Sequence, residues 1–226
     1  MGCRRGFGLA VGDTESPRVG GQIRIGSVAQ GADGDRQLYV VPVSARAPRA
    51  RADRFAIKGV EPSALLRGVE SDCEPVAELS ARDGEQRLHV WAVRSSGHLR
   101  GTWSRIAPGD WFLFVSRGRI FGVARVFGTC ESRATATALW GPTDGSEFRL
   151  LVVFDRVQEL DVPAWEYRSV LGGRFIGFRR LSDDFRGALV RKFGSVDDFA
   201  QRELPRATAR AAEEDGDDRA TRRAKP

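Results

Sequence analysis

The sequence contains very little lysine, histidine or cysteine, and it has no long apolar run. Only three of its 36 basic residues are lysines, beside two histidines and three cysteines. No apolar run approaches the roughly 20 residues that a membrane span needs. Residues 1–13 lack the sustained apolar stretch of a secretory signal. These absences favour a protein of the cytoplasm with no membrane partner.

The few cysteines and histidines also limit the chemistry. Cys3, Cys73 and Cys130 are odd in number and widely spaced, so they predict neither a disulfide framework nor a zinc site. We expect Cys73 and Cys130 to be inert thiols. His89 and His98 are too few for a histidine-rich metal site. The sequence therefore predicts no metal and no other cofactor.

A catalytic constellation is also missing. A metal-dependent nuclease of the Asp…Glu-x-Lys type needs carboxylates that hold the metal beside the scissile phosphate, and the sequence has no Glu-x-Lys or Asp-x-Lys. Neither histidine has the partners of a catalytic triad. We predict that the chain is not an enzyme. The alternative is a nuclease with an unrecognised active site that uses Asp110 or Asp155.

Arginine, in contrast, is abundant, and the formal net charge is +6. Residues 36–200 contain 25 basic and 20 acidic side chains, so nearly all of the positive excess lies in this part of the chain. An excess there is what a surface that attracts an anion requires. Biased codon usage explains the amount of arginine, whose planar guanidinium is suited to phosphate.

Composition divides the chain into three parts. Residues 1–35 are rich in glycine and show little periodicity, so we expect a disordered N-terminal segment. Residues 201–226 alternate blocks of opposite charge without any aromatic residue, which predicts a disordered charged tail. Residues 36–200 are expected to form a single domain. Within it, residues 36–85 either complete the sheet or form a partial extension.

The central part is rich in predicted strands. We expect them at residues 38–43, 88–93, 111–115, 120–127, 148–157 and 174–178. Gly118 lies between two of these runs and predicts a hairpin. Ser182 is an expected N-cap of a helix that ends at Gly194. Because crossover helices do not separate the strands regularly, we predict an α+β fold: a small curved, mostly antiparallel β-barrel with flanking short helices.

Four of the five tryptophans fall within 50 residues: Trp91, Trp103, Trp111 and Trp140. A flat indole can stack on a nucleobase, and several indoles can enclose one. Trp103 and Trp140 each follow a loop-like stretch, which makes them the best candidates for a pocket. Trp91 and Trp111 lie within expected strands and could face either side. For each of them, packing in the core is the alternative.

These segments resemble the EVE and YTH branch of the PUA-like superfamily over roughly residues 86–185. The matching motifs are His89-Val-Trp-Ala-Val-Arg-Ser95, Trp103, Pro108-Gly-Asp110, Phe112-Leu-Phe114, Ile120–Val126, Ala138-Leu-Trp140, Phe148–Phe154 and Asp161-Val-Pro163. The resemblance implies a PUA-like barrel that binds a nucleotide with a modified, for example methylated, base. In bacteria such domains also read DNA for modification-dependent restriction systems, including McrBC-like ones.

The resemblance also implies roles for individual residues. Trp103 and Trp140 resemble the walls of an aromatic cage for a flipped base, and Trp91, Ser95 and Trp111 are placed beside them. Arginines near these loops are expected to contact phosphates, namely Arg94, Arg100, Arg105, Arg117 and Arg119.

Together these observations predict a non-catalytic module that binds a modified base in DNA or RNA. Its expected partner is a separate nuclease or NTPase subunit of a restriction or defence system. An RNA-binding accessory protein of the PUA or ASCH type is a further alternative.

Overall fold

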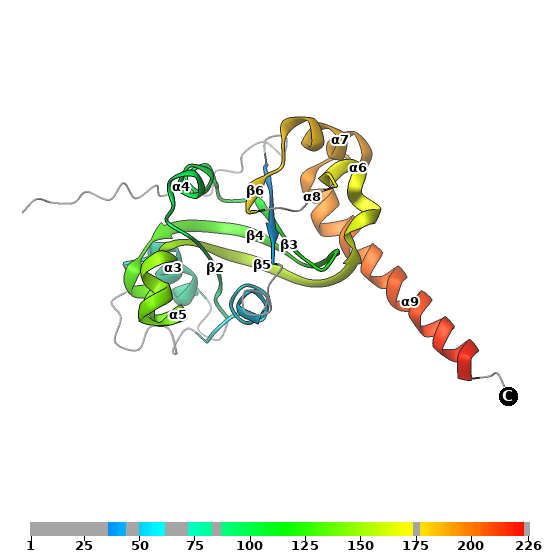
Figure 1. Ribbon diagram of the computed structural model, residues 1–226, viewed down its shortest axis with the longest axis horizontal. Coiled ribbons are helices and arrows are strands. Elements are labelled where there is room, and N and C mark those ends of the chain that lie inside the picture. Colours follow the sequence, from blue (N-terminus) through cyan, green and yellow to red (C-terminus); the bar gives the residue numbers. More distant parts are fainter. Residues whose placement is uncertain (1–35, 44–49, 62–71, 83–86, 174–176, 224–226) are drawn as a thin grey trace, which may run out of the picture.

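The computed structural model describes residues 36–43, 50–61, 72–82, 87–173 and 177–223. Its strands form one curled sheet with the order β2-β5-β4-β3-β1-β6 (Figure 1). They are β1 (Leu38–Pro42), β2 (His89–Val93), β3 (Trp111–Ser116), β4 (Arg119–Glu131), β5 (Leu150–Pro163) and β6 (Arg179–Arg180). Neighbouring strands are antiparallel except for β1 and β3, which run parallel. The predicted α+β class with a curved, mostly antiparallel sheet is confirmed.

Helices flank this sheet on both of its faces. They are the π-helix η1 (Ala52–Ile57), α3 (Glu74–Arg82), α4 (Gly97–Trp103), α5 (Arg133–Glu147), the 3-10 helix η2 (Ala164–Tyr167), α6 (Arg168–Leu171), α7 (Asp183–Phe193), α8 (Val196–Asp198), the π-helix η3 (Phe199–Glu203) and α9 (Leu204–Arg223). No helix in the described part of the chain is long and apolar enough to cross a membrane.

The concave face of the sheet is filled by aromatic and aliphatic side chains, which we call the interior cluster. Its buried members include Tyr39, Ala52, Ala56, Ile57, Ile106, Phe112, Phe114, Phe121, Val152 and Phe154, and Trp91, Leu99, Trp103 and Phe178 pack against them from less buried positions. The sheet is strongly curled, because Trp91 on β2 contacts Phe114 on β3 with 5.7 Å between ring centroids. Two strands separate β2 from β3 in the sheet.

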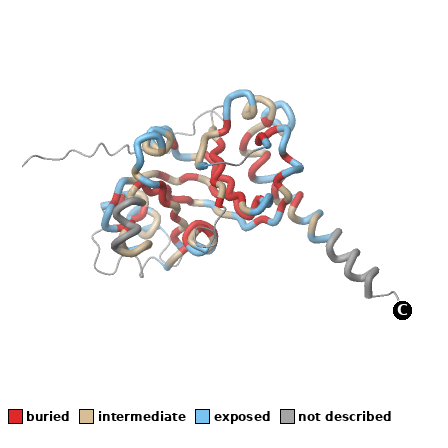
Figure 2. The backbone as a smooth tube through the Cα atoms, in the orientation of Figure 1, coloured by how far each residue is buried: buried red, intermediate tan, exposed pale blue. Residues whose placement is uncertain are grey.

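Alternation along the strands sends the neighbouring side chains to the outer face. Trp111 and Leu113 pack there under helices α6 to α9. Val90 and Leu151 pack under α3 and α5 in a second outer cluster. Figure 2 shows buried positions concentrated along the strands, between the more exposed outer helices.

A disulfide joins Cys73, at the start of α3, to Cys130, near the end of β4. The two Cα atoms lie 5.5 Å apart, and 57 residues separate the cysteines in sequence. Our expectation of two inert thiols was wrong. The sequence spacing gave no indication of the pair, because the contact arises only when α3 packs on the outer face of β4.

Both ends of the chain were expected to be disordered. Residues 1–35, expected to be disordered, lie outside the described residues. At the other end, residues 204–223 form helix α9, which projects from the body (Figure 1), although their composition predicted a disordered tail. The first turn of α9 is anchored by Leu204 and Ala207, which are 0% and 4% exposed. Pro205 is compatible with a first helical turn, where its missing N–H costs no hydrogen bond.

Candidate nucleic-acid interface

Three of the predicted site residues, Trp91, Ser95 and Trp103, lie on one short segment, and the structure packs two of them, Trp91 and Trp103, against the interior cluster. Trp91 lies on β2 and Trp103 ends α4, and both pack against the interior cluster while staying partly exposed. The Nε1–H of Trp103 donates a hydrogen bond of 3.0 Å to the carbonyl oxygen of Leu151. This bond fixes one edge of the indole. Ser95 lies in the connection between the two tryptophans and is partly exposed.

The loop after Trp103 is organised by the carboxylate of Asp110, which is 3% exposed. Its Oδ1 accepts from the backbone N–H of Gln37 at 2.8 Å, and its Oδ2 accepts from that of Ala107 at 2.9 Å. Gly109 turns the chain between them with a φ of +92°, which favours glycine. The Pro108-Gly-Asp110 motif is therefore structural, since it ties residues 104–110 to the start of β1.

The second acidic residue considered for catalysis, Asp155, lies on β5 beside Arg125 of β4. Their closest charged atoms are 3.3 Å apart. Burial raises the pKa of Asp155, and the Arg125 guanidinium opposes that rise. Across the residues that the structure describes, His, Cys, Asp and Glu form no group of three or more that could hold a metal ion.

The structure places the other two predicted cage residues in the outer clusters. Trp140 on α5 packs against Phe55, with ring centroids 5.2 Å apart. Trp111 is 1% exposed, and its Nε1–H donates a hydrogen bond of 3.0 Å to Asp197. The alternation of β3 explains this position, because Phe112 rather than Trp111 faces the interior.

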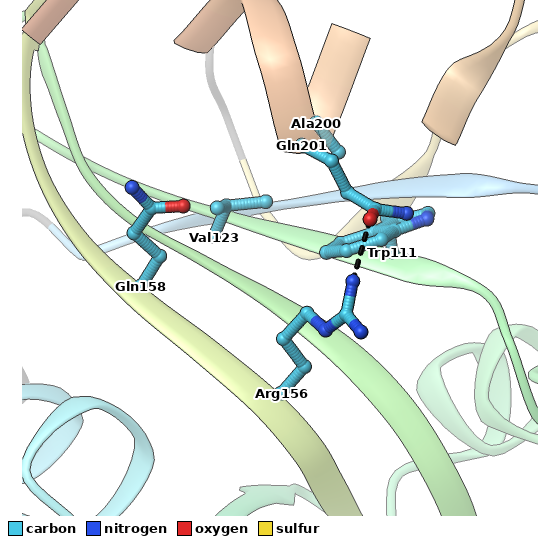
Figure 3. Close-up of a pocket in the computed structure, with 6 residues that line it drawn as sticks. All are labelled: Trp111, Val123, Arg156, Gln158, Ala200 and Gln201. Carbon is cyan, nitrogen blue, oxygen red and sulfur yellow. Dashed lines mark hydrogen bonds between the residues drawn. The ribbon is translucent and has the colours of Figure 1, made fainter. Parts of the chain in front are cut away.

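Trp111 does line a cavity, which lies on the outer face of the sheet (Figure 3). The other lining residues are Val123, Arg156, Gln158, Ala200 and Gln201, and Arg156 donates a hydrogen bond to Gln201. The cavity measures about 110 Å³. This is well below the roughly 300–1,000 Å³ of typical small-molecule sites, so it offers no room for a flipped nucleotide.

Three of the predicted phosphate-contacting arginines lie on the same segment as Trp103. Arg94 and Arg105 are exposed, and the Arg94 guanidinium lies 5.2 Å from the ring centroid of Phe148. Arg100 donates two hydrogen bonds of 2.8 Å to the carboxylate of Glu131. These bonds lower the pKa of Glu131. Arg100 is therefore engaged in an ion pair in the structure.

The other two arginines, Arg117 and Arg119, flank the β3–β4 turn. Arg117 adopts a positive φ of 50°, and Arg119 pairs with Asp161. The backbone N–H of Ala164 donates to the carbonyl oxygen of Gly118, which places this turn beside η2. The turn lies at the opposite end of β3 from residues 104–110. The structure thus separates Arg117 and Arg119 from Trp103.

His89 lies on the same face of β2 as Trp91, and it is half-buried. Its Nδ1 is 3.1 Å from the carbonyl oxygen of Ala56 in η1. Burial lowers the pKa of His89 below its usual 6.5, although the carbonyl of Ala56 acts in the opposite direction. The folded chain consequently holds this imidazole neutral at a pH where the unfolded chain binds a proton.

A loss of stability on mild acidification follows from this pKa. His89 contributes stability above about pH 6.5, and the contribution is lost as the pH falls through the lowered pKa of the folded state. We expect the urea midpoint to drop between about pH 7.5 and about pH 5, and His89→Gln to reduce that drop. His98→Gln, at an exposed site on α4, is the control. Equal pH dependence in wild type and His89→Gln would contradict the assignment.

Sequence reasoning missed Tyr39 and Phe178 as members of the site region. Tyr39 stacks on Phe112 and on Phe178, with centroid distances of 5.2 and 5.7 Å. The available signal was the apolar run of residues 38–43, in which Tyr39 is the one aromatic residue. The strand itself was predicted, but its position beside β3 depends on a parallel pairing between distant segments.

Comparison with known proteins identifies similar folds. No family model matches the chain, and a search of the curated proteins also found no match. Among solved structures, the N-terminal domain of Thermococcus gammatolerans McrB bound to m5C DNA matches with a TM-score of 0.50 and 16% identity. The match covers 70% of this chain and 98% of that domain. At this identity the similarity concerns the fold alone.

Two YTH domains also match, with lower TM-scores. The Pho92 YTH domain in complex with m6A has a TM-score of 0.38 and 12% identity, covering 72% of this chain and 88% of that one. The YTH domain of the Zygosaccharomyces rouxii MRB1 protein in complex with N6-methyladenosine RNA has a TM-score of 0.36 and 13% identity, covering 70% and 86%.

Proposed function

We propose that this chain is a non-catalytic reader of a modified base in nucleic acid. The observation that supports this function best is the aromatic concave face with two partly exposed tryptophans, Trp91 and Trp103, on a fold similar to that of a domain bound to m5C DNA. In the proposed complex the base leaves its helix and stacks on these indoles. In the same proposal Ser95, which lies between them in sequence, hydrogen-bonds the edge of the base.

In this binding mode, the free energy gained by stacking is similar in size to the free-energy cost of flipping the base. Flipping a base out of a duplex costs a few kcal/mol, and stacking on an aromatic side chain contributes about 1–3 kcal/mol per base. Arg94 and Arg105, exposed on the same segment, would contact phosphates beside the flipped base. Such contacts make the affinity fall with salt. The tryptophans would supply selectivity, and the arginines would supply affinity for any strand.

We further propose that strand cleavage or signalling resides in a separate nuclease or NTPase subunit of a restriction or defence system. The proposal agrees with the role of Asp110, whose carboxylate is occupied by two backbone N–H groups. A carboxylate bound in this way is a structural element rather than an acid available to a substrate.

Binding to matched oligonucleotides tests the proposal. We expect the chain to bind a duplex with one 5-methylcytosine or one N6-methyladenine more tightly than the unmodified duplex, at both about 50 and about 200 mM salt. Trp103→Ala should weaken binding of the preferred modified duplex by about 10- to 100-fold, since a stacking partner is lost. Fluorescence anisotropy measures both effects.

Two further variants serve as controls for this experiment. Trp165→Ala removes the most exposed tryptophan, which is 74% exposed on η2, and should bind like wild type. Trp103→Phe keeps an aromatic face but loses the hydrogen bond to Leu151. It therefore distinguishes the loss of base stacking from the loss of a bond that holds the indole in the fold. An affinity that ignores base modification would rule out the reader function. Wild-type binding by a folded Trp103→Ala variant would remove Trp103 from the site.

A further inference from the structure

The phenol of Tyr39 is a buried polar group at the centre of the molecule. Tyr39 is 0% exposed, and its hydroxyl has no hydrogen-bond partner among the described residues. Leaving a buried hydroxyl without a partner is costly, and most buried polar groups avoid it. The chain has one other tyrosine, Tyr167, and its hydroxyl donates to Glu203 at 2.9 Å. The two tyrosines therefore differ in whether the protein itself satisfies the hydroxyl.

The ring of Tyr39 is fixed from two sides. Tyr39 stacks on Phe112 with an interplanar angle of 29° and on Phe178 with an angle of 23°. Phe112 and Phe178 also contact each other at 5.7 Å. Phe112 in turn contacts Phe114, the ring that Trp91 touches edge-on. Tyr39 is thus linked to Trp91 by a continuous series of ring contacts through Phe112 and Phe114.

The surroundings of the hydroxyl point to the loop that follows Trp103. Burial raises the pKa of Tyr39 strongly, the charge of Asp110 adds to that rise, and Arg180 and Arg105 oppose it. The phenol is therefore neutral at physiological pH and retains its proton as a donor. Arg105 and Asp110 belong to the segment 104–110 that continues from Trp103. This segment is tied to the start of β1, because the N–H of Gln37, two residues before Tyr39, donates to Asp110 at 2.8 Å.

We propose that the Tyr39 hydroxyl donates a hydrogen bond to an acceptor on the edge of the bound base, a ring nitrogen or a carbonyl oxygen. This inference rests on the proposed function and names the group that would recognise the polar edge while Trp91 and Trp103 stack on the faces. Phe178, the partly exposed member of the stack, is the ring that has to move for the base to reach Tyr39. Methylated and unmethylated bases both present such an acceptor, so this hydrogen bond adds affinity for a base that has entered the site, while the tryptophans sense the modification.

Tyr39→Phe tests this inference because it deletes only the hydroxyl. We expect affinity for the preferred modified duplex, one 5-methylcytosine or one N6-methyladenine, to fall about tenfold, with the affinity for unmodified duplex unchanged. The midpoint of thermal unfolding should stay equal or rise, since no partner within the protein is lost. Tyr167→Phe is the matched control: it should lower the midpoint by about 2–4 °C and leave binding unchanged.

The outcomes separate the two proposals. A wild-type chain that ignores base modification removes the reader function. A wild-type chain that discriminates, together with wild-type affinity of Tyr39→Phe for the modified duplex, removes only the role of Tyr39. A clear loss of thermal stability in Tyr39→Phe would show that the hydroxyl has a partner within the chain, and this also overturns the inference.

Discussion

Reduction of the Cys73–Cys130 disulfide is expected to lower the free energy of unfolding by about 4 kcal/mol. The bond closes a loop of 57 residues, and removing a cross-link of that span restores chain entropy to the unfolded state by about this amount. For a chain of this size the midpoint of thermal unfolding should fall by about 10 °C. Urea unfolding with and without a reductant measures the difference.

Serine variants provide the controls for this measurement. Cys73→Ser combined with Cys130→Ser should reproduce the effect of the reductant and make the chain insensitive to it. Cys3→Ser, which leaves the pair intact, should behave like wild type. Identical unfolding curves in the presence and absence of reductant would show that the bond adds no stability. In a reducing cytoplasm the thiol form is the expected one, so the stability measured with reductant applies there.

Asp110→Ala is expected to destabilise the fold by about 3 kcal/mol, since it leaves two backbone N–H groups without their charged acceptor. The N–H groups of Gln37 and Ala107 both bond to this carboxylate, which is almost fully buried. Equilibrium urea unfolding measures the loss. We expect binding to weaken as well, because residues 104–110 include Arg105.

Asp110→Asn is the informative companion variant. Its amide oxygen can accept one of the two N–H groups, while its NH₂ group cannot accept the other. We therefore expect a stability between those of wild type and Asp110→Ala. If Asp110→Ala were as stable as wild type, the carboxylate would not be the group that anchors this loop.

Five of the six strands could be predicted, but the faces of some strands could not. The sixth, β6, lies at Arg179–Arg180 and not at the predicted residues 174–178, of which 174–176 lie outside the described residues. On β2 the alternation predicted from sequence is observed, with Val90 outside and Trp91 inside. On β3 both faces are buried, so a continuous apolar run such as residues 111–115 contains no information on which ring faces which side. This is why Trp111 was placed in the cage and Phe112 was not.

The missed helices have local causes. Helix α4 contains Gly97 and Gly101, and α5 is interrupted at Gly141, whose φ is +82°. Glycine disfavours helix, which accounts for the loop expected before Trp103. The stretch before Trp140, residues 133–139, contains no glycine, and its two β-branched threonines are weak helix formers. The wrong position predicted for Trp140 follows from the missed helix α5. Trp140 lies on this helix, which packs on the outer face of the sheet, and not on a loop beside Trp103.

The position of β1 has a consequence for how the chain folds as it is synthesised. Tyr39 of β1 pairs with Arg180 of β6 on one side and with Phe112 of β3 on the other. Strand β1 therefore waits for residues made more than a hundred positions later before both of its edges are paired. Such long-range pairing is slow, and an unpaired apolar strand is prone to aggregate. A nascent chain that stops before residue 179 would leave the β6 edge of that strand unpaired.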